Sequence, residues 1–218
     1  MKIYPSLISA DILNLETIIS QFNPLCDGYH IDIMDGHFVP NITWGPLFSN
    51  AIAKKTALPL DIHLMVSEPT TIAARLAPRE QDCITFHYEA VKNPLDILPI
   101  IAHIKNMRCL VGIAINPETP VVAVQQYLGH LDTLTIMSVN PGASGQPFIQ
   151  SIFEKIAQLI YLKTTLNPAL SLMVDGGVGV KNITELAKTG IDACAVASAI
   201  FSAFSPADAI KHLYKLAN

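Results

Sequence analysis

Residues 28–34, Gly28-Tyr29-His30-Ile31-Asp32-Ile33-Met34, form a largely apolar run of strand length that contains a His-x-Asp pair. Residues two apart in a strand point to the same face, with a rise of roughly 3.3 Å per residue, so His30 and Asp32 can converge on one ion. A second run, 59–65, contains His63, which can join them from a neighbouring strand. Imidazole and carboxylate groups are ligands of catalytic divalent metals, although packed core histidines would give the same pattern.

Similar apolar runs recur along the chain, mostly at intervals of roughly 20 to 30 residues. The eight runs are Ile3–Ser9, Gly28–Met34, Pro59–Met65, Asp82–His87, Cys109–Ile115, Thr133–Val139, Leu170–Val174 and Ala193–Ala197. The segments between them have helical periodicity and helix start signals. These segments are Leu13–Phe22, Pro46–Lys55, Thr70–Leu76, Pro94–Lys105, Thr119–Leu128, Phe148–Thr164, Asn182–Lys188 and Pro206–Leu216.

This alternation predicts a parallel sheet covered by helices, since buried parallel strands are apolar on both faces. Eight such units favour a (β/α)8 barrel, and a doubly wound open sheet is the alternative. No low-complexity segment or Pro/Gly/Ser-rich linker divides the chain, so we expect residues 1–218 to form one domain.

Composition narrows the possible partners and compartment. The net charge is −4 and the 14 basic residues are scattered, which argues against binding to nucleic acid or to an anionic membrane. The four cysteines form no Cys-x-x-Cys pair, which is typical of reduced thiols in a cytosolic protein. The first residues do not resemble a secretory signal, and no apolar stretch approaches the length of a membrane span. We therefore expect a cytoplasmic protein.

Polar residues occur where the predicted strands end, which is where (β/α)8 barrels place their active sites. They are Ser6, Ser9, His30, Asp32, His63, His87, Asn116, Asn140 and Asp175. Asp175 opens the turn Asp175-Gly176-Gly177 after the seventh strand, and it can supply a fourth metal ligand.

Small residues dominate three loops at the same end of the predicted barrel. These loops are Gly142-Ala143-Ser144-Gly145, Gly176-Gly177 and Ala197-Ser198. Loops after the last strands of a barrel can offer backbone N–H groups to a phosphate without a cationic side chain. Glycines that only form tight turns are the alternative for any single loop.

Several reaction classes lack their residues in this chain. A Schiff-base aldolase would need a lysine at the end of a strand, and no predicted strand ends with one. The chain also has neither the Gly-x-Ser-x-Gly elbow of hydrolases nor a Gly-x-Gly-x-x-Gly motif after a strand. Two carboxylates on separate strands can remove a proton from one face of a carbon and return one to the other face, while a metal stabilises the enolate. The sequence therefore favours epimerisation next to a ketone.

Longer motifs resemble the ribulose-phosphate 3-epimerase family over essentially the whole chain. They are Pro5-Ser6, the run from His30 to Asn41, Asp61-Ile62-His63-Leu64-Met65, Asn116-Pro117-Glu118-Thr119-Pro120, Val139-Asn140-Pro141-Gly142 and Val174-Asp175-Gly176-Gly177-Val178. The resemblance implies a (β/α)8 TIM barrel of the ribulose-phosphate-binding type. It implies an enzyme of the pentose phosphate pathway that interconverts D-ribulose 5-phosphate and D-xylulose 5-phosphate with one divalent metal ion.

The resemblance also implies roles for individual residues. The metal ligands would be His30, Asp32, His63 and Asp175, and Asp32 and Asp175 would also be the acid/base pair. Substrate contacts would come from Ser6, His63, Met34, Met65 and Met137, and phosphate contacts from Gly142, Ala143, Ser144, Gly145, Gly176, Gly177, Ala197 and Ser198. His87 and Glu89 would support the site from outside. The ligand set suits Zn²⁺, Fe²⁺, Mn²⁺ or Co²⁺, and apolar residues on the outer helices would allow a homo-oligomer.

Two departures from the family pattern affect the phosphate loops. The usual Asn-Pro-Gly-Phe-Gly-Gly-Gln is Asn140-Pro141-Gly142-Ala143-Ser144-Gly145-Gln146 here, and the usual Gly-Ser after strand eight is Ala197-Ser198. If that glycine has a positive φ, alanine would cost about 1 kcal/mol or shift an N–H contact. We therefore expect retained activity with weaker phosphate binding.

The nearest alternative is a D-allulose-6-phosphate 3-epimerase, whose members tend to replace two features that are present here as Gly177 and Ser198-Ala199-Ile200. Related barrel lyases, such as orotidine phosphate decarboxylase and hexulose phosphate synthase, depend on an Asp-x-Lys run where this chain has Asp61-Ile62-His63. A catalytically silent phosphosugar-binding barrel is the third possibility, and the intact carboxylate pair argues against it.

Overall fold

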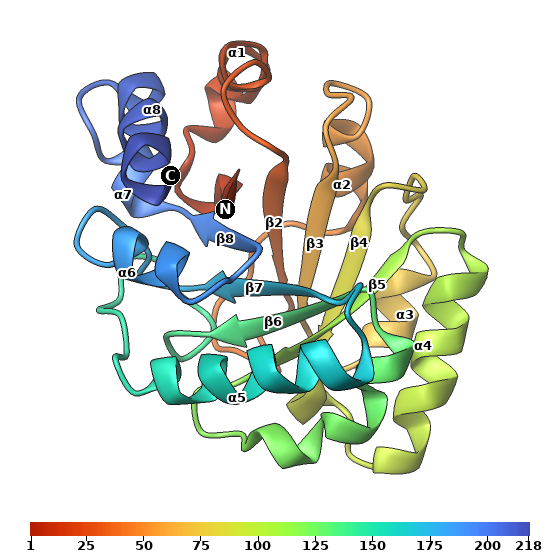
Figure 1. Ribbon diagram of the computed structural model, residues 1–218. Coiled ribbons are helices and arrows are strands. Elements are labelled where there is room, and N and C mark those ends of the chain that lie inside the picture. The colour runs from red at the N-terminus through yellow and green to blue at the C-terminus, as the bar shows by residue number, and fades with distance from the viewer.

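The computed structural model describes residues 1–218 as eight parallel strands surrounded by helices (Figure 1). The strands are β1 Lys2–Pro5, β2 Tyr29–Met34, β3 Leu60–Met65, β4 Cys83–His87, β5 Leu110–Ile115, β6 Thr133–Met137, β7 Ser171–Asp175 and β8 Ala193–Val196. The α-helices are α1 Leu15–Phe22, α2 Pro46–Ile52, α3 Pro69–Ala73, α4 Ile97–Asn106, α5 Ile152–Leu166, α6 Ile183–Lys188, α7 Ser198–Phe201 and α8 Pro206–Ala217.

The strands form one sheet in the order β1-β8-β7-β6-β5-β4-β3-β2, so every neighbour in the sheet is also a neighbour in sequence except β1 and β8. Between β1 and β2 the sheet closes through an isolated parallel bridge that pairs Ser6 with His30. This order and closure are those of a (β/α)8 barrel, and they confirm the predicted fold over the open-sheet alternative.

Two predicted elements differ from the structure, and one observed helix was not predicted. The first strand ends at Pro5, and Leu7–Ser9 form a 3₁₀ turn instead of the end of a longer strand. The segment 119–128 forms two 3₁₀ helices, Val121–Ala123 and Gln125–His130, because Pro120 and three valines favour an α-helix poorly and Gly129 interrupts it. The short helix α7 directly after β8 was not expected from the sequence.

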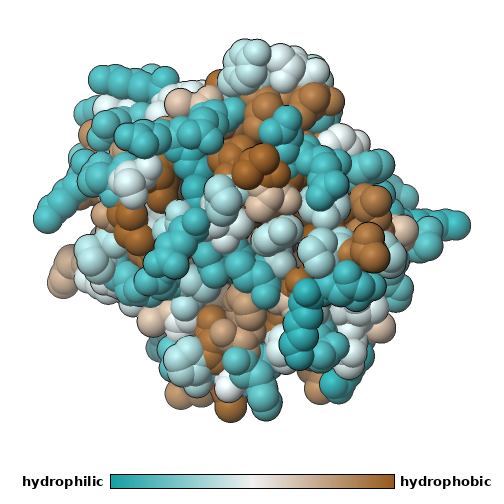
Figure 2. All heavy atoms as spheres, turned by 90° about the horizontal axis from the view of Figure 1, so that it is seen from below, coloured by the Kyte–Doolittle hydropathy of each residue, from teal (hydrophilic) through white to brown (hydrophobic).

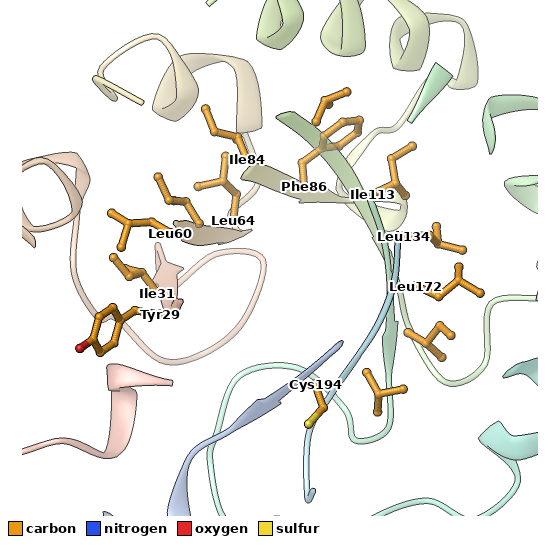
Figure 3. Close-up of a cluster of buried hydrophobic side chains, with 14 of the residues drawn as sticks. Tyr29, Ile31, Leu60, Leu64, Ile84, Phe86, Ile113, Leu134, Leu172 and Cys194 are labelled. Atoms are coloured by element: carbon orange, nitrogen blue, oxygen red, sulfur yellow. The ribbon is translucent and has the colours of Figure 1, made fainter. Parts of the chain in front are cut away.

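Alternation along the strands separates an apolar outer face from a polar interior. Outward residues such as Ile31, Leu64, Phe86 and Leu172 are fully buried between the strands and the helices, as Figure 3 shows. The alternate residues point into the barrel because successive side chains of a strand face opposite sides. Many of these interior residues are polar, namely His30, Asp32, Asp61, His63, Thr85, His87, Thr135 and Asp175. The fold therefore gathers many of its buried polar side chains along the barrel axis.

The outer surface is mixed in character. On the face drawn in Figure 2, apolar residues form small separate groups among hydrophilic ones, as is usual for the surface of a folded protein. None of the helices combines the length and the hydrophobicity that crossing a lipid bilayer requires.

Candidate active site and metal centre

Four side chains from three strands converge near the carboxyl end of the barrel. His30 and Asp32 come from β2, His63 from β3 and Asp175 from β7, and one ligand atom of each lies within 4.8 Å of the others. The β2–β3 register places Asp32 beside His63. Both histidines are completely buried, and the Asp175 side chain keeps 14 % of its surface exposed. The three strands thus hold two imidazoles and two carboxylates around one point.

Five of the six distances among the four ligand atoms are close to those of a tetrahedral cation site. His30 Nε2 lies 3.1 Å from Asp32 Oδ1, 3.5 Å from Asp175 Oδ2 and 3.3 Å from His63 Nδ1. His63 Nδ1 lies 3.6 Å from Asp32 Oδ1 and 3.2 Å from Asp175 Oδ2. Tetrahedral ligands with metal bonds of about 2.0 to 2.2 Å are separated from one another by about 3.3 to 3.6 Å. The cluster can therefore hold a divalent ion with little rearrangement.

The second oxygens of the two carboxylates have different surroundings. Ser6 Oγ donates a hydrogen bond of 2.6 Å to Asp32 Oδ2. Asp175 Oδ1 accepts no hydrogen bond from the protein, and Asp175 lines the cavity above the cluster. Each carboxylate thus has one oxygen outside the cluster. Asp32 Oδ2 accepts a hydrogen bond from Ser6, whereas Asp175 Oδ1 has no protein donor.

A chain of hydrogen bonds supports His63 from behind. His63 Nε2 lies 2.8 Å from His87 Nε2, and His87 Nδ1 lies 3.2 Å from Glu89 Oε2. Burial, with the nearby charge of His63, lowers the pKa of His87 to about 4, so its imidazole is neutral near pH 7. A neutral His87 that donates from Nδ1 to Glu89 accepts at Nε2 from His63, which leaves the Nδ1 lone pair of His63 for a cation. His87 and Glu89 therefore lie outside the cluster, behind His63.

Without a metal, the two histidines would hold the protons that balance the carboxylates. Burial alone opposes an imidazolium, but hydrogen bonds to Asp175 and Asp32 outweigh it and raise the pKa of His63 from 6.5 to about 9. The pKa of His30 is also raised, against burial, by the charges of Asp32 and Asp175. The pKa values of both carboxylates are lowered because the charge of His30 outweighs the effect of burial.

These shifts predict that the metal-free protein loses stability as the pH rises. His63 titrates near 6.5 in the unfolded chain and near 9 in the folded one, so its stabilisation is complete below pH 6.5 and disappears as the pH passes 9. The loss amounts to about 3 kcal/mol in the free energy of unfolding. Urea unfolding of chelator-treated protein at both ends of this range measures it, with His37→Gln, which changes an exposed histidine, as the control. Equal stability at the two ends would contradict the prediction.

A cavity of about 50 Å³ opens above the cluster at the carboxyl ends of the strands. All of the predicted site residues except His30 and His63 line it, and those two lie buried beneath it. The lining residues are Ser6, Asp32, Met34, Met65, Met137, Gly142, Ala143, Ser144, Gly145, Asp175, Gly176, Gly177, Ala197 and Ser198, together with Ile8, Val139, Pro141, Val178 and Ala195, which the sequence did not single out. No lysine or arginine lines this cavity.

The loops around the cavity approach one another at their backbones. Gly177 has a φ of +60°, and a Cβ there would lie 2.8 Å from both the carbonyl oxygen of Gln146 and the amide nitrogen of Phe148. Only glycine fits this position, since a side chain would collide with backbone. Ala197 has a φ of −105°, so the left-handed cost considered for alanine at this position does not arise.

Three side chains hold the loop 142–146, and the sequence analysis predicted none of these contacts. Asn41, which follows β2, donates a hydrogen bond to the carbonyl oxygen of Gly142. Gln146 donates to the carbonyl oxygens of Asn140 and Ala143 at 2.7 and 2.9 Å. Ser9 Oγ lies 3.1 Å from Ser144 Oγ, where it can donate to the same loop. Asn41 and Gln146 belong to the motifs from His30 to Asn41 and from 140 to 146 that the sequence analysis quoted. A single sequence does not show which side chains contact one another across loops.

The fold and the cluster define a (β/α)8 barrel whose His and Asp side chains could hold a metal ion beneath a cavity lined by small-residue loops. Within that class, the chain belongs to the Ribulose-phosphate 3 epimerase family, whose sequence model matches residues 2–201. A ribulose-phosphate 3-epimerase of Helicobacter pylori is 39% identical over 201 residues, which cover 92% of this chain and 91% of the relative. One from Methanocaldococcus jannaschii is 37% identical over 218 residues, which cover 100% of this chain and 91% of the relative.

Solved structures share the fold at low sequence identity. KGPDC from Streptococcus mutans superposes with a TM-score of 0.71 at 12% identity, covering 99% of this chain and 96% of that one. Orotidine 5'-phosphate decarboxylase from Pyrococcus horikoshii gives a TM-score of 0.68 at 13% identity, with 99% and 98% coverage. At these identities the likeness concerns the barrel alone.

Proposed function

We propose that this chain is a metal-dependent epimerase that interconverts D-ribulose 5-phosphate and D-xylulose 5-phosphate by proton transfer at C3. One observation carries the proposal: Asp32 and Asp175, from β2 and β7, share one cluster beneath a cavity rimmed by small-residue loops. Family membership and the names of the relatives support the substrate. The proposed place of the reaction is the pentose phosphate pathway in the cytoplasm.

His30, Asp32, His63 and Asp175 would hold one divalent cation, and Zn²⁺, Fe²⁺, Mn²⁺ and Co²⁺ all suit two imidazoles and two carboxylates. When bound, such an ion supplies positive charge that stabilises the enediolate formed between the two proton transfers. The buried histidines hold the two carboxylates at fixed positions by the contacts described above.

Asp32 and Asp175 act as the two proton carriers in this proposal. Asp32 begins ionised and removes the C3 proton of ribulose 5-phosphate. Asp175 begins protonated and donates its proton to C3 from the opposite face, so the step ends with Asp32 protonated and Asp175 ionised, the state from which the reverse reaction starts. Asp175 Oδ1 suits this task because no protein donor occupies it. The Ser6 hydroxyl orients Asp32 and, at the edge of the cavity, also lies near enough to contact substrate.

The rest of the cavity would bind and shield the sugar phosphate. Met34, Met65 and Met137 are nearly completely buried where they line the cavity, so their polarizable side chains can pack on the planar intermediate and exclude water. The phosphate would be held by backbone N–H groups of 142–145, 176–177 and 197–198, since no cationic side chain is available there. Ser198 opens α7, and the first N–H groups of a helix have no intrahelical acceptor.

An assay in D₂O tests the proposal directly. The purified protein, loaded in turn with Zn²⁺, Mn²⁺, Fe²⁺ or Co²⁺, is expected to exchange the C3 hydrogen of D-ribulose 5-phosphate with solvent and to form D-xylulose 5-phosphate. D-allulose 6-phosphate run in parallel is expected to react far more slowly, because Gly177 and Ser198 of the five-carbon pattern both line the cavity. Absence of exchange and product with every metal would refute the proposal.

We also propose that 1–218 folds as one domain and assembles as a homo-oligomer. The large apolar side chains of Leu13, Ile42 and Leu47 are mostly exposed, and burial between copies would remove them from water.

A further inference from the structure

A carboxylate that belongs neither to the cluster nor to the cavity above it contacts the first histidine of the cluster. Asp61 lies opposite His30 in the β2–β3 register. His30 Nδ1 is 2.7 Å from Asp61 Oδ2, while His30 Nε2 faces Asp32 and Asp175. Asp61 is 4 % exposed, so its negative charge is largely withdrawn from water.

The contact decides which ring nitrogen of His30 carries the proton when the other one binds a metal. A ring nitrogen binds a cation through its lone pair, so a His30 that faces a metal with Nε2 must carry its proton on Nδ1. Asp61 Oδ2 accepts that proton in a hydrogen bond, and Thr85 Oγ1 donates to Asp61 Oδ1 at 3.0 Å. Both oxygens of Asp61 therefore have partners, and the carboxylate cannot rotate away from His30 without losing one of them.

We infer that Asp61 is a positioning residue that aims His30 Nε2 at the metal and holds its ring in the Nδ1–H tautomer. The inference rests on the proposed metal site and deepens it. A buried carboxylate behind a ligating histidine raises the basicity of the ring and fixes its orientation. The other histidine has a neutral partner instead, since His63 contacts His87. The two imidazole ligands are thus held by different means, and Asp61 is the partner of His30 on its Nδ1 side.

The variant Asp61→Asn tests the inference because it keeps the shape and removes the charge. The amide can also donate to Nδ1 and drive the proton onto Nε2, where it blocks a metal. We expect the dissociation constant for Zn²⁺ or Co²⁺ to rise by about 10- to 100-fold. Competition of the stripped full-length protein with a chromophoric chelator measures it. In the stripped protein, at an alkaline pH where His30 is a neutral imidazole, the ¹⁵N resonances of His30 are expected to lose the signature of a single Nδ1–H tautomer.

Asp132→Asn is the matched control. Asp132 lines the same cavity as Asp61, at the other end of the barrel, and accepts from the Val111 N–H, but it contacts no histidine. The dissociation constant of Asp132→Asn for the metal is expected to stay within about twofold of the wild-type value. That change is smaller than the effect of removing a partner of a metal-binding histidine. If Asp61→Asn does not fold, Thr85→Val, which removes only the donor to Asp61, is expected to weaken metal binding by a smaller factor.

Two outcomes would overturn the inference while leaving the epimerase proposal intact. The first outcome is that Asp61→Asn folds and binds metal as tightly as the wild type. If Asp61→Asn does not fold, the same result for Thr85→Val counts instead. The second outcome is that Asp61→Asn binds metal more weakly while the tautomer of His30 stays unchanged. A wild-type protein that binds metal tightly and epimerises nothing would refute the proposed function alone, because metal affinity is measured without substrate.

Discussion

Asp175→Asn is expected to lower the turnover of D-ribulose 5-phosphate by about 10²- to 10⁴-fold, because the variant loses the group that carries a proton to one face of C3. An amide oxygen can still face the cluster in place of Oδ2, so the metal site is disturbed less than the chemistry. Steady-state kinetics with metal in excess measures the loss. Near-normal turnover would mean that Asp175 has been assigned the wrong role.

The same variant should separate the two halves of the reaction. Asp32 remains, so the C3 hydrogen of ribulose 5-phosphate should still exchange with D₂O while xylulose 5-phosphate is not formed. Asp208→Asn is the control, since that carboxylate lies exposed on α8. If Asp175→Asn with a fully occupied metal site loses hydrogen exchange and product formation to the same extent, then Asp32 and Asp175 do not act separately on the two faces of C3.

His30→Ala is expected to have the largest effect on metal content and stability. The substitution removes one of four ligands, opens a space in the barrel and leaves Asp61 buried without the proton donor on Nδ1. Removing one partner of a buried charged pair costs about 3 to 5 kcal/mol in the free energy of unfolding. Metal analysis of the purified variant and urea unfolding measure the two effects.

A second substitution in the same chain tests the physical reason. Asp61→Ala combined with His30→Ala removes the unpaired carboxylate, so it should recover part of the lost stability without restoring metal. A double variant that is no more stable than His30→Ala alone would be inconsistent with this explanation.

The barrel was predictable because each of its eight units has its own hydrophobic pattern. The predicted and observed strands agree to within a few residues, except where Leu7–Ser9 form a 3₁₀ turn. That turn follows from barrel closure, which pairs Ser6 with His30 and ends the strand there. Such a pairing between distant residues leaves no mark in local periodicity. The 3₁₀ helices of 121–130 were missed for the related reason that spacing alone does not separate 3₁₀ from α geometry.

The site was predictable where residue type and position at a strand end coincide. His30, Asp32, His63 and Asp175 meet as expected because parallel strands end at the same rim. Asp61 was quoted in a motif without a role, because its importance depends on the register that places it beside His30. Asn41 and Gln146 were missed likewise, since their partners lie across loops.

The closure between β1 and β2 links assembly of the barrel to the proposed chemistry. The only bridge between these strands joins His30 to Ser6, whose hydroxyl also holds Asp32. A closed barrel has no free strand edges, whereas an opened one presents two that can pair with other chains. The cluster joins β2 and β3, on one side of this bridge, to β7 on the other side. The proposed acid/base pair therefore also ties together the two sides of the barrel where it closes.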